Sequence, residues 1–239
     1  MSQPPPSDPA DVEGQISAIA VLNEPIRRAL YRYALAQAGP VGRDEAARAF
    51  SISRELAAFH LDKLVDHGLL DVEYRRLSGR QGPGAGRPAK LYRRSARQLE
   101  VSLPERRYDL AGRLLAQAVE EGGDPAEAVD RVARRFGEEL GTQARRHAGR
   151  RPGAERLLER ACGVLEGYGF EPIRAGGEVR LRNCPFDAIA KEHTALVCGM
   201  NLSIMRGVVD GLRARNLDAE LAPEPGWCCV VLRRSDPEL

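Results

Sequence analysis

Residues 53–69 read SRELAAFHLDKLVDHGL, and this stretch decides how the first part of the chain is expected to fold. Its apolar residues recur at the spacing of one helix face, and they are Ala57, Leu61, Leu64 and Val65. Charged residues fall largely on the opposite face, so the pattern predicts an amphipathic helix over residues 54–66. The pair His67-Gly68 ends this helix, because glycine readily adopts the backbone conformation found after a last helical turn.

The segments on either side extend the pattern. Upstream, the apolar spacing predicts a helix that begins near Asn23 and ends near Gly39, then a short alanine-rich helix over residues 43–50. Downstream, residues 69–77 and 89–94 favour two strands, joined by a segment rich in glycine and proline. Helix, short helix, tight turn, helix and β-hairpin in this order are typical of a winged helix-turn-helix.

The predicted hairpin is strongly basic. From Arg75 to Arg97 the chain contains no acidic residue, and its basic residues are Arg75, Arg76, Arg80, Arg87, Lys90, Arg93, Arg94 and Arg97. A block of one charge sign indicates a polyanionic partner such as nucleic acid. The alternative is a solvated basic loop without a partner.

The sequence of the third helix resembles a known family. Through SRELAAFHL at residues 53–61 and the following Gly68-Leu69, it is similar to the arsenic-repressor-like (ArsR) superfamily of bacterial winged-helix regulators. The resemblance covers about residues 20–95 and implies that the third helix enters the major groove of double-stranded DNA. The outward residues expected to contact DNA are Ser53, Arg54, Ala58, His60 and Lys63. For His60 the alternative is a hydrogen-bonded structural role.

The hairpin supplies the second set of expected DNA contacts. These are Arg75, Arg76, Arg80, Arg87, Lys90 and Arg93. The tip, Gly86-Arg87-Pro88, resembles in miniature the Gly-Arg-Pro cores that place an arginine in narrow A·T-rich minor grooves. The alternative is a flexible tip whose basic side chains touch only phosphates.

The chain divides into four predicted regions. Residues 1–15 contain no apolar block and are expected to form a disordered tail, followed by a DNA-binding domain over residues 16–100. Residues 101–150 predict two helices, expected to form a dimer interface, with packing onto their own chain as the alternative. Residues 151–235 mix helices with short strands and are expected to form a small sensor domain, so the predicted fold class is α+β.

The composition excludes several classes of protein. The 239 residues include 36 Lys+Arg and 34 Asp+Glu and are 43% hydrophobic, which excludes a wholly disordered chain. The sequence contains no run of about 18 uninterrupted apolar residues, so no membrane span is expected. It also shows no export signal, so a cytoplasmic location is expected. No phosphate loop, nucleophile elbow or HExxH motif is present, so an enzyme is not expected.

Four of the five cysteines lie beyond residue 180, close to glycine or proline at the ends of predicted elements. Thiolates are soft ligands that bind zinc and iron-sulfur clusters, so Cys184, Cys198, Cys228 and Cys229 are candidate metal ligands. Burial in the core is the alternative, because free cysteine is often a core residue. Cys162 falls on the apolar face of a predicted helix and is expected to be a core residue.

The adjacent pair Cys228-Cys229 is predicted to lie on the last strand, residues 227–232. Neighbouring residues of a strand point to opposite faces, so only one of the two is expected to serve a metal, with Cys228 preferred. A fourth ligand, if one is present, is expected among His193, Asp187 and Cys229.

The C-terminal region also resembles a known family. The segments NCPF at 183–186, LVC at 196–198 with His193 before it and Asn201 after it, and PGWCCV at 225–230 are similar to the sensor domain of the SufR-like group, which represses iron-sulfur cluster assembly genes. The resemblance implies an iron-sulfur cluster held by Cys184, by Cys198 and by one of Cys228 and Cys229. Zinc and the absence of any metal are the alternatives.

These features together predict a cytoplasmic, homodimeric transcriptional regulator. It is expected to be a repressor that binds double-stranded DNA and responds to an iron-sulfur cluster or another thiophilic metal. One alternative is a winged-helix regulator that responds to a small organic ligand, with purely structural cysteines. Another is a protein-interaction module without DNA affinity, against which the basic hairpin argues.

Overall fold

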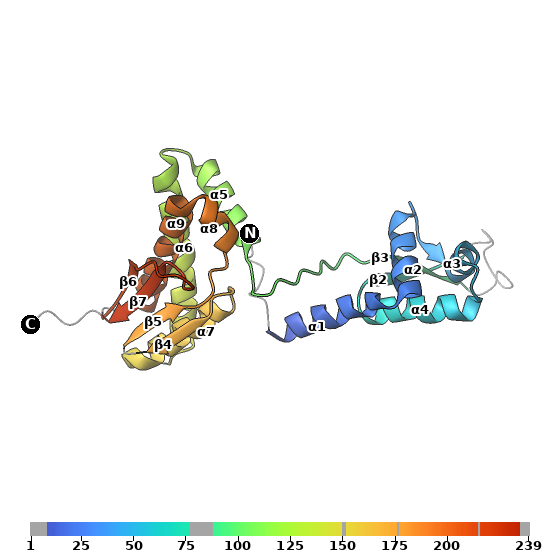
Figure 1. Cartoon of the computed structure of the whole chain (residues 1–239), viewed down its shortest axis with the longest axis horizontal. Helices are drawn as coiled ribbons and strands as arrows, with labels where there is room; N and C mark the ends of the chain where they lie inside the picture. Colours follow the sequence, from blue (N-terminus) through green and yellow to red (C-terminus); the bar gives the residue numbers. More distant parts are fainter. Residues whose placement is uncertain (1–8, 77–87, 150–151, 176, 215, 235–239) are drawn as a thin grey trace, which may run out of the picture. The chain divides into compact units, whose positions relative to one another are not determined.

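The computed structural model describes residues 9–76, 88–149, 152–175, 177–214 and 216–234 (Figure 1). It divides the chain into two compact units, Asp8–Val101 and Ser102–Leu239, which we call the N-terminal unit and the C-terminal unit. Each unit combines helices with one small antiparallel sheet. The predicted α+β class is therefore confirmed.

The N-terminal unit contains the helices that the apolar spacing predicts. Its described elements are α1 (Pro9–Ala20), η1 (Val21–Asn23), α2 (Pro25–Ala36), β1 (Val41–Gly42), α3 (Arg43–Phe50), α4 (Arg54–Asp66), β2 (Leu70–Arg75) and β3 (Ala89–Arg94). Strand β3 pairs with both other strands, so the sheet order is β1-β3-β2, and Tyr92 lies opposite Val41 on one side and Val72 on the other. Leu61, Leu64 and Tyr92 are buried at the centre of this unit.

Polar caps set where these helices begin. Glu24, rather than Asn23, caps α2, and its carboxylate accepts hydrogen bonds from the first turn, including the backbone N–H of Arg27 at 2.6 Å. The Oγ of Ser53 accepts from the backbone N–H of Leu56 at 3.1 Å and begins α4. The short break between α3 and α4 is therefore fixed by the polar residues that the sequence places there.

The predicted disordered tail over residues 1–15 is wrong for residues 9–15, which form the first part of α1. Ala18 of this helix is buried, and the side chain of Gln15 accepts a hydrogen bond from the backbone N–H of Glu100 at 2.7 Å. These contacts join residues that are far apart in the sequence, so local composition does not reveal them. Residues 1–8 lie outside the described part of the chain.

The C-terminal unit holds the second sheet and the predicted helical pair. Its described elements are α5 (Tyr108–Glu121), α6 (Pro125–Arg146), α7 (Ala154–Glu166), β4 (Pro172–Ala175), β5 (Glu178–Leu181), α8 (Asp187–Glu192), α9 (Thr194–Leu212), β6 (Leu217–Leu221) and β7 (Val230–Arg234). The sheet order is β4-β5-β7-β6, with all neighbours antiparallel. Helices α5 and α6 belong to this unit, so residues 101–150 do not form a separate region.

Helices α6 and α9 approach each other very closely, because glycines line their contact. A Cβ atom placed on Gly137 of α6 would overlap the carbonyl oxygen of Ile204, and one placed on Gly207 of α9 would overlap that of Arg134. The apolar side chains of α6 are buried in the same core. This face of α6 therefore packs onto its own chain, which is the alternative to the dimer interface expected for it.

Helix α9 is long and apolar enough to cross a membrane, which the search for uninterrupted apolar runs does not predict. Its most apolar window is 67% buried inside the unit. Burial of this kind is typical of the central helix of a folded domain. Length and composition alone are weak evidence for a membrane span.

Candidate functional site

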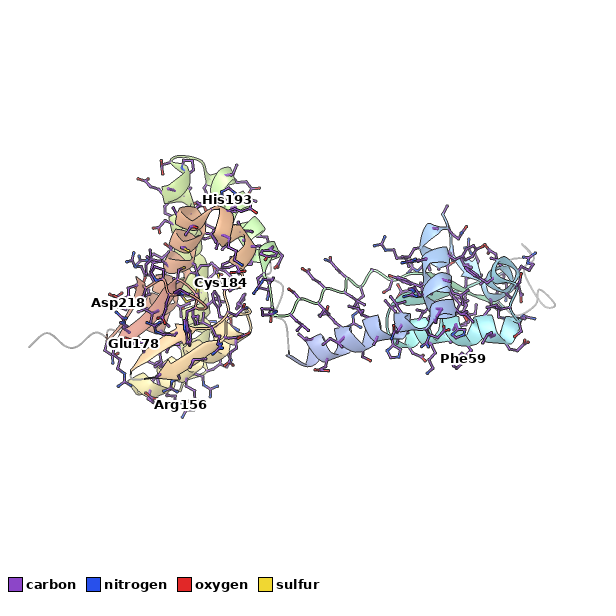
Figure 2. The ribbon with its side chains drawn as sticks, in the orientation of Figure 1. Phe59, Arg156, Glu178, Cys184, His193 and Asp218 are labelled. Atoms are coloured by element: carbon purple, nitrogen blue, oxygen red, sulfur yellow. The ribbon has the colours of Figure 1, made fainter. Side chains whose placement is uncertain are left out.

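Four cysteines meet in the C-terminal unit, although they come from separate segments. Cys184 lies in the turn between β5 and α8 (Figure 2), and Cys198 lies in the first part of α9. Cys228 and Cys229 lie in the loop between β6 and β7. The thiol of Cys228 is hydrogen-bonded to Cys184 and to Cys229, and Cys229 is in turn hydrogen-bonded to Cys198. We call these four residues the thiol network.

The prediction that Cys228 and Cys229 lie on the last strand is wrong. Strand β7 begins at Val230, and the two cysteines precede it in a loop with a turn at Gly226, whose φ is +82°. The N–H of Cys228 donates to the carbonyl of Leu181 at 2.8 Å, at the end of β5. Outside a strand the alternation of side chains does not apply, so both cysteines join the network.

Contacts within the network determine which thiols hold their protons. The hydrogen bond from Cys228 lowers the pKa of Cys184 and lowers the pKa of Cys229 to about 6. The same hydrogen bonds raise the pKa of Cys228, and burial raises the pKa of Cys198 to about 12. The network therefore favours thiolates at Cys184 and Cys229 and thiols at Cys198 and Cys228, and the four groups titrate together.

Asn201 brings an amide group to the same place. It lies three residues after Cys198 on α9, a spacing that puts both side chains on one helix face. Its side chain is 1% exposed, and Nδ2 donates to the Sγ of Cys228 at 3.0 Å. Its Oδ1 is also buried and has no hydrogen-bond partner. The sequence alone does not indicate that Asn201 lies beside the sulfurs, because Cys228 is distant from it along the chain.

The donor atoms of the network suit a thiophilic metal, although they are not yet arranged around one. Among the residues that the structure describes, no three His, Cys, Asp or Glu side chains form a group that can hold a metal ion as they stand. The thiols are linked one after another, so a shared ion requires some of these side chains to rotate. Four sulfurs from three segments are nevertheless a soft donor set.

The other candidate ligands do not join the network. His193 is exposed at the N-cap of α9, and Figure 2 shows it well apart from Cys184. The carboxylate of Asp187 is paired with Lys191 at 2.8 Å. Cys162 is buried on the apolar face of α7, and burial raises the pKa of its thiol to about 11. Its expected role as a core residue agrees with this position.

The turn that contains Cys184 is hydrogen-bonded to the beginning of the C-terminal unit. Asn183 is buried, and its Nδ2 donates to the carbonyl oxygen of Glu105 at 2.9 Å. Arg106 donates to the side chain of Asn183 and, at 3.3 Å, to the carbonyl oxygen of Cys184. The backbone N–H of Arg107 donates to another carbonyl of this turn at 2.9 Å. We call this set of bonds the turn anchor.

In the N-terminal unit, the candidate residues at the start of α4 are exposed. Ser53 caps the helix, and the Nε of Arg54 lies 2.7 Å from a carboxylate oxygen of Asp44 on α3, with both side chains more than half exposed. Lys63 lies near the end of the helix, 3.5 Å from Asp66. An exposed ion pair is weak, so the Arg54 guanidinium can exchange Asp44 for another partner.

Two neighbouring residues of α4 differ from expectation. His60 is 6% exposed, so it does not face outward as expected, and its buried Nδ1 lies 3.5 Å from a carboxylate oxygen of Glu24 without forming a hydrogen bond. Ala58 is partly buried. Phe59, which was not expected to contact a partner, is 53% exposed on the outer surface of α4 (Figure 2). The sequence does offer a signal for this exposure, because Phe59 is a large aromatic residue outside the apolar stripe of the helix.

The block from Arg75 to Arg97 is acid-free in the sequence but not in space. Carboxylates of α4 and of the first hairpin strand approach its basic groups, and the pairs are Lys90 with Asp62 at 2.6 Å, Arg75 with Glu73 at 3.0 Å, and Arg93 with Asp71 at 3.8 Å. Arg76 is exposed. The candidates Arg80 and Arg87 lie outside the described residues. Lys90 is the most engaged of the described candidates, because Asp62 also accepts a hydrogen bond from Tyr92 at 2.7 Å.

The C-terminal unit also has a surface cavity of about 550 Å³ between the first turns of α6 and α9. Its walls include Val129 and Asp130 from α6 and Leu196 and Met200 from α9. The wall also contains Arg131, which is paired with Glu127, so a mixed apolar and charged cavity of this size suits a small organic molecule.

Comparison with known proteins gives no relative for this chain. No family model matches its sequence, and neither the curated proteins nor the solved structures include a match. The function is therefore inferred from the chemistry of the residues described above.

Proposed function

We propose that this chain is a DNA-binding transcriptional regulator that senses an iron-sulfur cluster or another thiophilic metal. The observation that carries the proposal is the meeting of four thiols from three separate segments in one unit of the chain. Chance core packing gives isolated buried cysteines such as Cys162, whereas hydrogen-bonded thiols with thiolate character are typical of metal or redox sites.

The N-terminal unit supports the DNA-binding part of this proposal. Helices α3 and α4 are joined by a short turn, and the β2-β3 hairpin follows directly, with β1 as a third strand. This is the element order of a winged helix-turn-helix, in which α4 would enter the major groove and the hairpin would lie along the backbone. The N-terminal end of α4 is exposed and carries Arg54, as base readout from a recognition helix requires.

The sensing residues in this proposal are Cys184, Cys198, Cys228 and Cys229. An iron-sulfur cluster, when bound, supplies a redox-active centre whose occupancy depends on the state of the cell. The protein's part is to present thiolates at Cys184 and Cys229 and to exclude water through the buried sides of Asn201 and Cys228. Sensing requires that the bound metal stabilise one DNA-binding state of the chain more than the other.

Anaerobic purification followed by iron, sulfide and zinc analysis tests this proposal directly. We expect iron with matching sulfide, or zinc in its place, in the protein as isolated. Absence of all three after anaerobic purification and attempted reconstitution would reject the metal-sensing part. In that case the cavity between α6 and α9 favours the second candidate function, a winged-helix regulator that responds to a small organic ligand.

A homodimer is part of the proposal, because winged-helix regulators of this kind read two related half-sites. The apolar face of α6 is already buried against its own chain, so the dimer surface must lie elsewhere. Sedimentation analysis of the full chain at several concentrations should give a species of twice the 26.2 kDa chain mass. A monomer that binds a single half-site would contradict this part alone.

The first prediction concerns the electrostatic part of DNA binding. Arg93→Ala should reduce the slope of log affinity against log salt by about one unit, because each phosphate contact releases about 0.9 condensed cations. Filter binding or fluorescence anisotropy over a range of salt concentrations measures the slope. Arg156→Ala, an exposed arginine of the C-terminal unit (Figure 2), is the control and should leave it unchanged. Binding that does not depend on salt would exclude a phosphate-contacting surface.

The second prediction concerns base readout. Arg54→Ala should weaken binding to a specific operator by about 1–3 kcal/mol while leaving binding to random DNA nearly unchanged, if the guanidinium makes a bidentate contact to guanine. The loss of the exposed pair with Asp44 should cost little folding stability. An operator selected from random DNA by the purified protein supplies the specific site. Equal losses on both DNAs would make Arg54 a phosphate contact.

A further inference from the structure

Asn201 is a buried amide beside the thiol network, and the proposed function does not yet give it a role. It is buried in the middle of α9, on the same helix face as Cys198, and one of its two polar atoms donates to the Sγ of Cys228. The other polar atom, Oδ1, is buried without any hydrogen-bond partner. A buried carbonyl without a partner destabilises a fold, because it has lost its hydration and gained nothing in exchange.

Among the residues that the structure describes, the other polar side chains buried in the same unit have partners, and Arg233, whose Nε makes no hydrogen bond, is ion-paired with Glu178. Asn183 uses both polar atoms of its amide in the turn anchor. Ser203, two residues after Asn201 on α9, is hydrogen-bonded to Asp130 of α6. The unpaired oxygen of Asn201 is therefore not a general property of this core, and it occurs where the thiol network is.

We propose that Asn201 belongs to the metal site and that its Oδ1 supplies the non-cysteine ligand beside the thiolates. This inference rests on the proposed metal-sensing function and adds a specific ligand to it. A neutral amide oxygen completes a ligand set without adding a further negative charge to several thiolates. The candidates considered from the sequence do not offer this, because His193 is exposed and Asp187 is paired with Lys191.

The proposal makes different demands on the metal-free and metal-bound protein. Without metal, the unsatisfied buried oxygen of Asn201 offsets the hydrogen bond that its Nδ2 donates to Cys228, so its removal should change stability little. With metal, the same oxygen becomes a ligand, so its removal should weaken binding. A residue with a purely structural role would lose stability in both states.

The test uses the full chain, reduced and metal-free, titrated anaerobically with Co(II), which reports its ligands through its visible absorption. Asn201→Ala should raise the Co(II) dissociation constant at least about tenfold and change the absorption spectrum, while the urea midpoint of the metal-free protein changes little. Asn201→Asp should restore Co(II) affinity, because it supplies an oxygen ligand, while lowering the metal-free midpoint, because it buries a charge.

Ser203→Ala is the matched control, since it removes a satisfied buried polar group from the same helix. It should lower the urea midpoint and leave the Co(II) affinity and spectrum unchanged. The proposal is overturned if Asn201→Ala binds Co(II) with the affinity and spectrum of the parent, or if Ser203→Ala weakens binding equally. A parent protein that binds neither Co(II) nor iron would instead reject the metal-sensing function, and this proposal with it.

Discussion

Cys184→Ser and Cys198→Ser should each remove most of the bound iron and sulfide from anaerobically purified protein. A serine hydroxyl is a hard, weakly acidic ligand and does not replace a thiolate on a soft metal. Cys184 lies in a turn and Cys198 in a helix, so each substitution removes the sulfur ligand that its own segment supplies. Metal and sulfide analysis, together with visible absorption of the purified variants, gives the result. Zinc content should fall in the same way if zinc is the resident metal.

Cys162→Ser is the control for these variants, because Cys162 is buried in α7 and lies outside the thiol network. It should keep the metal content of the parent and mainly reduce stability, since a hydroxyl replaces a thiol in an apolar environment. Cys228→Ser and Cys229→Ser, compared side by side, identify which of the adjacent pair is the stronger ligand. Metal content equal to that of the parent in all four network variants would show that these thiols hold no metal.

Gly137→Ala and Gly207→Ala should each destabilise the C-terminal unit by about 1–3 kcal/mol or more. The new methyl group would meet a backbone carbonyl of the opposite helix, and a backbone cannot rotate aside as a long side chain can. Helices α6 and α9 must therefore move apart, which loosens the core around them. Urea unfolding of the metal-free protein, followed by circular dichroism, measures the change in the free energy of unfolding.

Glycines elsewhere in the helices provide the control for this prediction. Gly112 of α5 and Gly163 of α7 have nothing within 4 Å of the position of an added Cβ atom. Alanine at either place should stabilise the protein by about 0.5–1 kcal/mol, because alanine is the better helix former. If Gly137→Ala and Gly112→Ala changed stability in the same direction, the close contact between α6 and α9 would be excluded.

Much of the fold was predictable, because the signals for its elements are local. Apolar spacing in the sequence predicts α2, α3 and α4. The polar residue Ser53 precedes the predicted helix over residues 54–66, and in the structure it caps α4, which begins at Arg54. Strand β3 has the predicted boundaries of residues 89–94. Helix α1 was missed, because its order depends on contacts of residues such as Gln15 with the distant Glu100.

The candidate sites were predicted less completely, because they depend on which distant segments meet. The charge of the hairpin could be read from the sequence, but its neutralisation by Asp62 and Asp71 required the fold. Likewise, the sequence identifies the four cysteines as candidate ligands. It does not predict that Cys228 and Cys229, in the loop before β7, connect the thiols of Cys184 and Cys198. Strand β7 begins only at Val230, so Cys228 and Cys229 are not in a strand and their side chains do not have to point to opposite faces of the sheet.

The turn anchor attaches the first residues of the C-terminal unit to the turn that contains Cys184. The chain leaves the N-terminal unit at Val101, and the next residues to be held by long-range hydrogen bonds are Glu105 to Arg107. Their partners include the turn that contains Cys184 and, for Arg107, the carbonyl oxygen of Gly167 at the end of α7. The segment that follows Val101 is therefore held at the turn that contains Cys184. A displacement of that turn would reach residues 105–107 through these hydrogen bonds.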